Sequence, residues 1–117
     1  MTIHLTPEAF NKACSLMFIK VVEHRPPTAR PNIILKGAIR EFKHFISLGD
    51  NLLRMKSNQT KYFIIERDSG GVSIIPKPGG LGIYITKDNQ HLMGQYMKHS
   101  PKPTSMVEWR RIFGDNQ

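Results

Sequence analysis

The spacing of the apolar residues changes once along this chain, close to Lys61, and that change decides which fold classes remain open. Before Lys61, apolar residues recur at intervals of three and four, the period of an amphipathic helix. After it, short runs of β-branched and aromatic residues are separated by turn residues, as in β-hairpins. The connections between these runs are too short for a parallel crossover. The chain is therefore predicted to adopt an α+β fold, in which two N-terminal helices pack on a three-stranded antiparallel meander and short C-terminal helices close it.

The first helix is predicted to begin at Pro7, because Thr6 suits an N-cap and proline suits the first helical position. It must end close to His24, since Pro26 disfavours a helical conformation in the residue before it. Residues 24–31 contain three prolines. That composition predicts a stiff, extended connector between the first two helices.

The second helix is predicted to run from about Asn32 to Ser47, with Gly49 capping its C-terminus in a left-handed conformation. Gly37 inside it costs about 1 kcal/mol relative to alanine. The apolar face of this helix consists of Leu35, Ala38, Ile39, Phe42, Phe45 and Ile46. A second interpretation makes residues 42–55 a strand pair that turns after Gly49. The periodicity favours helix up to Ser47 and leaves residues 52–55 open.

Strands are predicted at residues 62–65, 72–75 and 82–86, with residues 68–71 forming the hairpin turn between the first two. Tyr62, Phe63 and Tyr84 lie on these strands. The sheet needs large side chains against the helices, so Phe63 and one of the two tyrosines are expected in the core. The other tyrosine would then be available to stack on an unpaired base.

Two short helices are predicted after the meander. Residues 91–97 fit the first, which ends before the Ser100-Pro101-Lys102-Pro103 break. In the second, Ser105 and Glu108 have the spacing of a capping box. Met106 and Phe113 fall on one side of it together with Trp109, which is expected to anchor this helix on the body of the protein.

Length and composition limit what the chain is expected to be. The 117 residues fit one domain, residues 1–117, with 39% hydrophobic and 22% charged residues, which are globular values. No apolar run is long enough to cross a bilayer, and the N-terminus lacks the pattern of a secretion signal. We therefore predict an intracellular protein with no membrane partner.

Nothing in the sequence points to a catalytic residue, a metal site or a cofactor. Cys14 is the only cysteine, and its helical spacing among apolar residues predicts a core position. His91 and His99 are eight positions apart, whereas two zinc ligands on one helix need a spacing of three or four. The chain is accordingly predicted to hold no metal and no cofactor.

The charge of the chain indicates its class of partner. Seventeen lysines and arginines against nine acids give a formal net charge of +8, and the pI is about 9.9. A polyanion gains most from such a surplus. The cations are spread along the chain without a basic tail, so folding must assemble any positive surface.

The best candidate for that surface is a stripe on the second helix, formed by Lys36, Arg40 and Lys43 and continued by Ser47. Spacings of four, three and four place these residues on one side, away from the apolar face. The stripe is predicted to contact nucleic-acid phosphates. Four further arginines are candidates for the same role, two in the connector and two near the C-terminus: Arg25, Arg30, Arg110 and Arg111.

Three functions follow as hypotheses. The first is a small, non-catalytic DNA- or RNA-binding protein. The second is a metal-independent RNA-cleaving enzyme, because the order of a short N-terminal strand (residues 2–5), two helices and a meander resembles the layout of the small, basic bacterial mRNA-interferase toxins. That resemblance implies catalysts among Arg67, Tyr84, His91 and Lys98. The third is an inhibitor or adaptor whose basic face binds an acidic protein surface.

Overall fold

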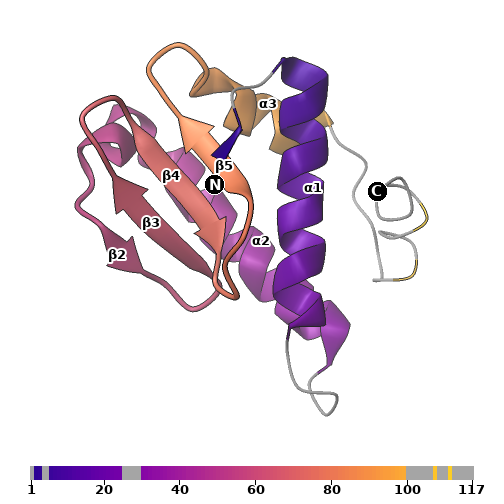
Figure 1. The fold of residues 1–117 in the computed structure, drawn as a ribbon. Helices are drawn as coiled ribbons and strands as arrows, with labels where there is room; N and C mark the ends of the chain where they lie inside the picture. Colours follow the sequence, from indigo (N-terminus) through magenta and orange to yellow (C-terminus); the bar gives the residue numbers. More distant parts are fainter. Residues whose placement is uncertain (1, 4–5, 25–29, 100–106, 108–110, 112–117) are drawn as a thin grey trace.

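The structure is a computed structural model, and it describes residues 2–3, 6–24, 30–99, 107 and 111 (Figure 1). The helices are α1 (Pro7–Glu23), α2 (Pro31–Ser47), the 3₁₀ helix η1 (Gly49–Arg54) and α3 (His91–His99). The strands are β1 (Thr2–Ile3), β2 (Asn58–Gln59), β3 (Phe63–Arg67), β4 (Val72–Pro76) and β5 (Gly82–Ile85).

The strands form one five-stranded sheet in the order β1-β5-β4-β3-β2. β2 to β5 pair antiparallel in sequence order, and β1 pairs parallel with β5 at the edge. In Figure 1, α2 crosses behind the sheet and α1 stands beside it, against β4 and β5. The predicted α+β architecture is confirmed. The sheet is wider than the predicted meander because two-residue strands are added at both of its edges.

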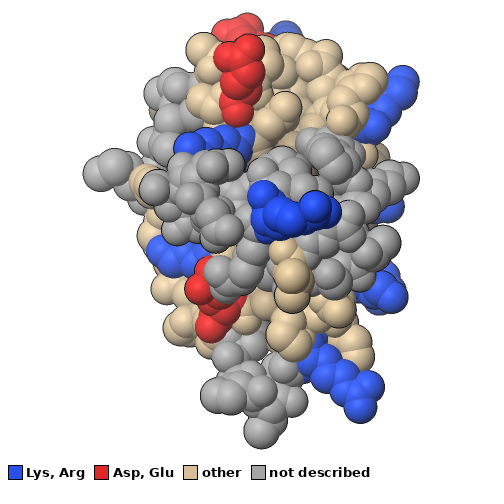
Figure 2. Space-filling view, turned by 90° about the vertical axis from the view of Figure 1, so that its right-hand side faces the viewer, with Lys and Arg blue, Asp and Glu red and all other residues tan. Residues whose placement is uncertain are grey.

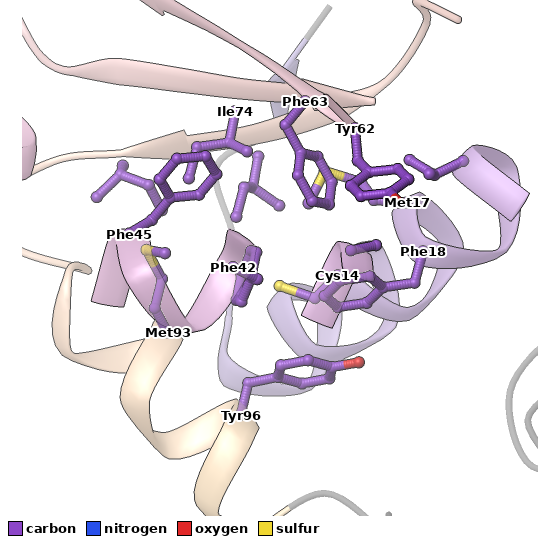
Figure 3. Packing of buried hydrophobic residues seen from close by; sticks show 14 of the residues in the cluster. Cys14, Met17, Phe18, Phe42, Phe45, Tyr62, Phe63, Ile74, Met93 and Tyr96 are labelled. Atoms are coloured by element: carbon purple, nitrogen blue, oxygen red, sulfur yellow. The ribbon is translucent and has the colours of Figure 1, made fainter. Parts of the chain in front are cut away.

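The aromatic core lies between the sheet and the helices (Figure 3). The ring of Phe18 on α1 lies 5.2 Å from that of Phe42 on α2 and 5.8 Å from that of Phe63 on β3, in edge-to-face geometry. Tyr96 brings α3 into the same cluster, stacked 6.3 Å from Phe18. Cys14 is fully buried, as predicted, and burial raises the pKa of its thiol well above the usual value.

α1 begins and ends where the sequence predicts. The hydroxyl of Thr6 accepts a hydrogen bond of 3.3 Å from the Ala9 amide, and Pro7 occupies the first turn. His24 follows the last helical residue as the C-cap. The predicted connector overlaps α2 by one residue, because Pro31 begins that helix. Residues 25–29 lie outside the described residues.

The strand-pair interpretation of residues 42–55 is wrong. α2 continues to Ser47, and η1 then covers residues 49–54. Gly49 has a φ of 55°, the left-handed conformation predicted for it. The helical spacing of the apolar residues therefore outweighed the turn-forming residues around Gly49.

The segment after the meander is described only in part. α3 extends to His99, two residues beyond the predicted end. The predicted capping box and the proposed anchor Trp109 lie outside the described residues, as do Arg25 and Arg110. Val107 is exposed.

Candidate nucleic-acid interface

The stripe on α2 faces solvent along its whole length. Lys36, Arg40 and Lys43 are all exposed, whereas Ala38 and Phe42 on the opposite side have no exposed surface. The two sets alternate as a helix of 3.6 residues per turn requires. Burial of the apolar side against the sheet therefore fixes the direction in which the three cations point.

The only acidic residue of α2 is turned away from the stripe. Both carboxylate oxygens of Glu41 accept from the Tyr62 backbone N–H at 3.2 Å, and one also accepts from the Thr60 hydroxyl. These bonds fasten the helix to the turn between β2 and β3. Within the described part of the chain, Lys36, Arg40 and Lys43 have no hydrogen-bond or ion-pair partner, so their charges are available to a ligand.

Ser47, the last member of the predicted stripe, has a local role. Its hydroxyl donates a hydrogen bond of 2.6 Å to the backbone carbonyl of His44. The donor that a phosphate oxygen would need is thus already used. The part of the stripe that can bind a ligand therefore consists of its three cations, with the exposed Ile33 beside them.

The additional arginines are only partly placed by the structure. Arg30 is exposed at the N-cap of α2, so it extends the positive charge beyond the first turn of that helix. Arg111 is also exposed. On the side of α1 seen in Figure 2, lysines and arginines lie singly among other residues, and acidic side chains lie at the top and at the lower left of the view. That side does not present one continuous basic patch among its described residues.

The residues suggested for RNA cleavage are not brought together. Tyr84 alternates with the buried Ile83 and Ile85, so it lies on the face of the sheet opposite the helices. His91 and Lys98 belong to α3, which packs on the helix-covered face. The side chain of Arg67 donates to the Arg54 carbonyl at 3.2 Å. We therefore identify no catalytic cluster among these residues.

Tyr84 and Asp68 form a small network on the hairpin turn. The Tyr84 hydroxyl donates to a carboxylate oxygen of Asp68 at 2.5 Å, and the same oxygen accepts from the amides of Gly70 and Gly71. These bonds lower the pKa of the Asp68 carboxyl, the tyrosine contributing most, and the hydrogen bond to that carboxylate raises the pKa of Tyr84. Tyr62 is buried, as one tyrosine was predicted to be, which leaves Tyr84 as the aromatic ring on the open face.

Two hollows were not foreseen from the sequence. One, of about 520 Å³, lies between α1 and the loop before β5. The other, of about 370 Å³, lies between the end of α2, η1 and the first turn of α3. The residues that form its walls lie some forty positions apart in the sequence. The only local feature that could have indicated this hollow is Gly94, a glycine inside a helix.

Comparison with known proteins does not assign this chain to a family. No protein-family model, no curated protein and no solved structure matches this chain. Within the described residues, no group of three or more His, Cys, Asp or Glu side chains is arranged to hold a metal ion. None of the helices described is both long and apolar enough to cross a membrane.

Proposed function

We propose that this protein binds nucleic acid without catalysis, and that Lys36, Arg40 and Lys43 contact the phosphates. The observation that carries the proposal is the set of three exposed cations on one side of α2, with Glu41 on the same helix bonded elsewhere. The net charge of +8 supports it, because long-range attraction to a polyanion adds to the local contacts.

The dimensions of the stripe suit a nucleic-acid strand. Seven helical residues separate Lys36 from Lys43, a rise of about 10 Å. That length corresponds to about three nucleotides at about 3.4 Å of rise each. Arg40, in the middle, offers a planar guanidinium that binds two phosphate oxygens at once. The stripe can therefore offer a cation to each of about three successive phosphates.

An acidic protein surface is the competing partner, since carboxylates also bind exposed lysines. Phosphates are favoured because their charge is dense and regularly spaced, whereas carboxylates on a folded surface are interrupted by neutral residues. The RNA-cleaving alternative has no clustered residues to support it, so binding is the function proposed.

The test compares two triple variants that lose the same charge. Lys36→Ala/Arg40→Ala/Lys43→Ala removes the stripe, and Arg54→Ala/Lys56→Ala/Lys98→Ala removes one arginine and two lysines that are exposed and lie outside α2. Affinity is measured by fluorescence anisotropy on single- and double-stranded DNA and RNA of equal length. The stripe variant should lose at least about 10-fold in affinity and the control much less, while both keep the wild-type melting temperature.

Three results would overturn the proposal. If wild-type protein binds no probe better than micromolar at low salt, the chain is not a nucleic-acid-binding protein. If both triple variants weaken binding equally, only the net charge acts and the stripe has no special role. If polyglutamate competes as well as the oligonucleotides do, the partner is an acidic protein.

A further inference from the structure

The hollow beside α3 lies above the edge of the core and has a polar rim. Phe45, Leu52 and Met93 line it from α2, η1 and α3, and each is almost completely buried from the solvent. The rim consists of exposed or half-buried polar side chains, which are Asp50, Lys87, Gln90 and His91. A volume of about 370 Å³ falls at the lower end of the range of small-molecule sites, about 300–1,000 Å³.

The rim carries hydrogen-bonding groups of both kinds. Asp50 accepts, Lys87 donates, and the amide of Gln90 does both. The half-buried Ile46 and Gly94 supply accessible apolar surface beside this rim. Such a combination suits a flat heterocycle, whose faces are apolar and whose edge bears donors and acceptors. The bases of nucleic acids have this character.

The hollow lies at one end of the stripe. Ile46, which lines it, lies one helical turn after Lys43 on a neighbouring side of α2. Gly94 lines the opposite side, so the C-terminal turn of α2 and the first turns of α3 form its two walls. A strand whose phosphates follow the stripe toward Lys43 therefore reaches the opening of the hollow within about one nucleotide.

We propose that this hollow receives one unpaired base of a single-stranded nucleic acid bound along the stripe; this inference rests on the proposed function and narrows its ligand. A base within a duplex is stacked and paired, so it enters a pocket only after being flipped out, at an energetic cost. A single strand presents its bases without that cost. The protein should therefore prefer single strands to duplexes.

The second hollow does not fit the same role. It lies between α1 and the loop before β5, away from the stripe. Its charged lining residues are Lys20 and Glu23, which largely cancel each other for a phosphate. The hollow beside α3 is thus the one that continues the basic surface of α2.

Gly94 allows the hollow to be filled without disturbing the core. A Cβ atom placed on Gly94 has no other atom within 4 Å, and the residue does not have a positive φ. Gly94→Leu should therefore fold and occupy the space meant for the base. Gln95→Leu is the matched control, because it places the same side chain on the neighbouring, exposed position of α3.

Affinity is measured for a single-stranded 12-mer, the same strand with abasic sites throughout, and the duplex of that sequence. Gly94→Leu should weaken binding of the intact single strand about 10-fold, the effect of losing one base contact, and leave the abasic strand and the duplex unchanged. Gln95→Leu should bind all three as the wild type does. Lys87→Ala, an exposed rim change, should lower affinity for the intact strand more than for the abasic strand or the duplex, for which only the general loss of one charge counts.

The failure of this inference is distinguishable from failure of the proposed function. If the stripe variant loses affinity while Gly94→Leu and Lys87→Ala bind the intact strand normally, the protein binds phosphates but the hollow takes no base. An intact strand that binds no better than the abasic strand would likewise show that no base enters the hollow. If no oligonucleotide binds the wild type, the proposed function itself is wrong.

Discussion

Replacing Gly37 by alanine should destabilise the protein, although alanine normally stabilises the interior of a helix. The Cβ atom of an alanine at this position would lie 2.6, 2.8 and 2.9 Å from the Oη, Cε2 and Cζ atoms of Tyr62. The ring of Tyr62 is buried, with 7% of the residue exposed. The backbone of Tyr62 is held on both sides, because its amide donates to Glu41 and its carbonyl accepts from Lys77 at 3.0 Å. Only the ring can move to relieve these contacts.

Two opposing terms set the magnitude. Glycine to alanine in a helix interior contributes about 1 kcal/mol of stability. Displacing a packed ring costs about 1–3 kcal/mol, the usual cost of overfilling a core. The expected net effect of Gly37→Ala is therefore a loss of about 1 kcal/mol in the free energy of unfolding.

Gly94→Ala is the control, since a methyl group there meets no atom within 4 Å. It should stabilise the protein by about 0.5–1 kcal/mol. Urea denaturation followed by circular dichroism measures both changes from the midpoint at constant slope. In a Tyr62→Ala background the sign should reverse, and Gly37→Ala should then stabilise. If Gly37→Ala stabilises the wild type as much as Gly94→Ala does, the Tyr62 ring does not occupy the space above Gly37.

Two further changes test the polar contacts of the fold. The hydroxyls of Ser15 and Tyr96 lie 3.0 Å apart in the core, and Ser15 also donates to the Asn11 carbonyl at 3.0 Å. Ser15→Ala should cost about 1–3 kcal/mol in the free energy of unfolding, because it leaves the buried Tyr96 hydroxyl without this partner. Tyr96→Phe should cost less than half of that in the same urea assay, because Ser15 keeps its bond to Asn11. Equal costs would contradict this asymmetry. The Tyr84 hydroxyl lowers the pKa of Asp68 in the folded protein. The bond should therefore contribute its full stabilisation above the ordinary carboxyl pKa of about 3.9, and this stabilisation should disappear as the pH falls through the lowered pKa. Tyr84→Phe should raise the pKa of Asp68 in an NMR titration, and an unchanged titration would show that the bond does not form in solution.

Elements with a repeating apolar pattern were predictable from the sequence. α1, α2 and the hairpin of β3 and β4 each contain several apolar residues at a regular spacing, and one buried face fixes each element. β1 and β2 have two residues each, too few to show any period, and they form only because β5 and β3 offer an edge to pair with. Their existence depends on tertiary contacts.

The candidate site likewise has features that the sequence predicts and features that only the folded structure shows. The exposure of Lys36, Arg40 and Lys43 follows from helical spacing alone and agrees with the sequence prediction. The bond that occupies the Ser47 hydroxyl depends on a rotamer, which spacing does not specify. The hollow beside α3 requires residues near Phe45 and Met93 to meet, and only the packing of α3 against α2 brings them together.

The salt dependence of binding tests the central claim most directly, because it counts the phosphates that the protein neutralises. The association constant for a single-stranded oligonucleotide is measured over a series of salt concentrations for the wild type and for Lys36→Ala/Arg40→Ala/Lys43→Ala. The logarithm of the wild-type constant should fall against the logarithm of salt concentration with a slope of about −3 to −5. Removing the stripe should make that slope shallower by about 2 to 3, close to one for each lost phosphate contact. A slope that stays the same after all three cations are removed would place the phosphate contacts elsewhere and contradict the account.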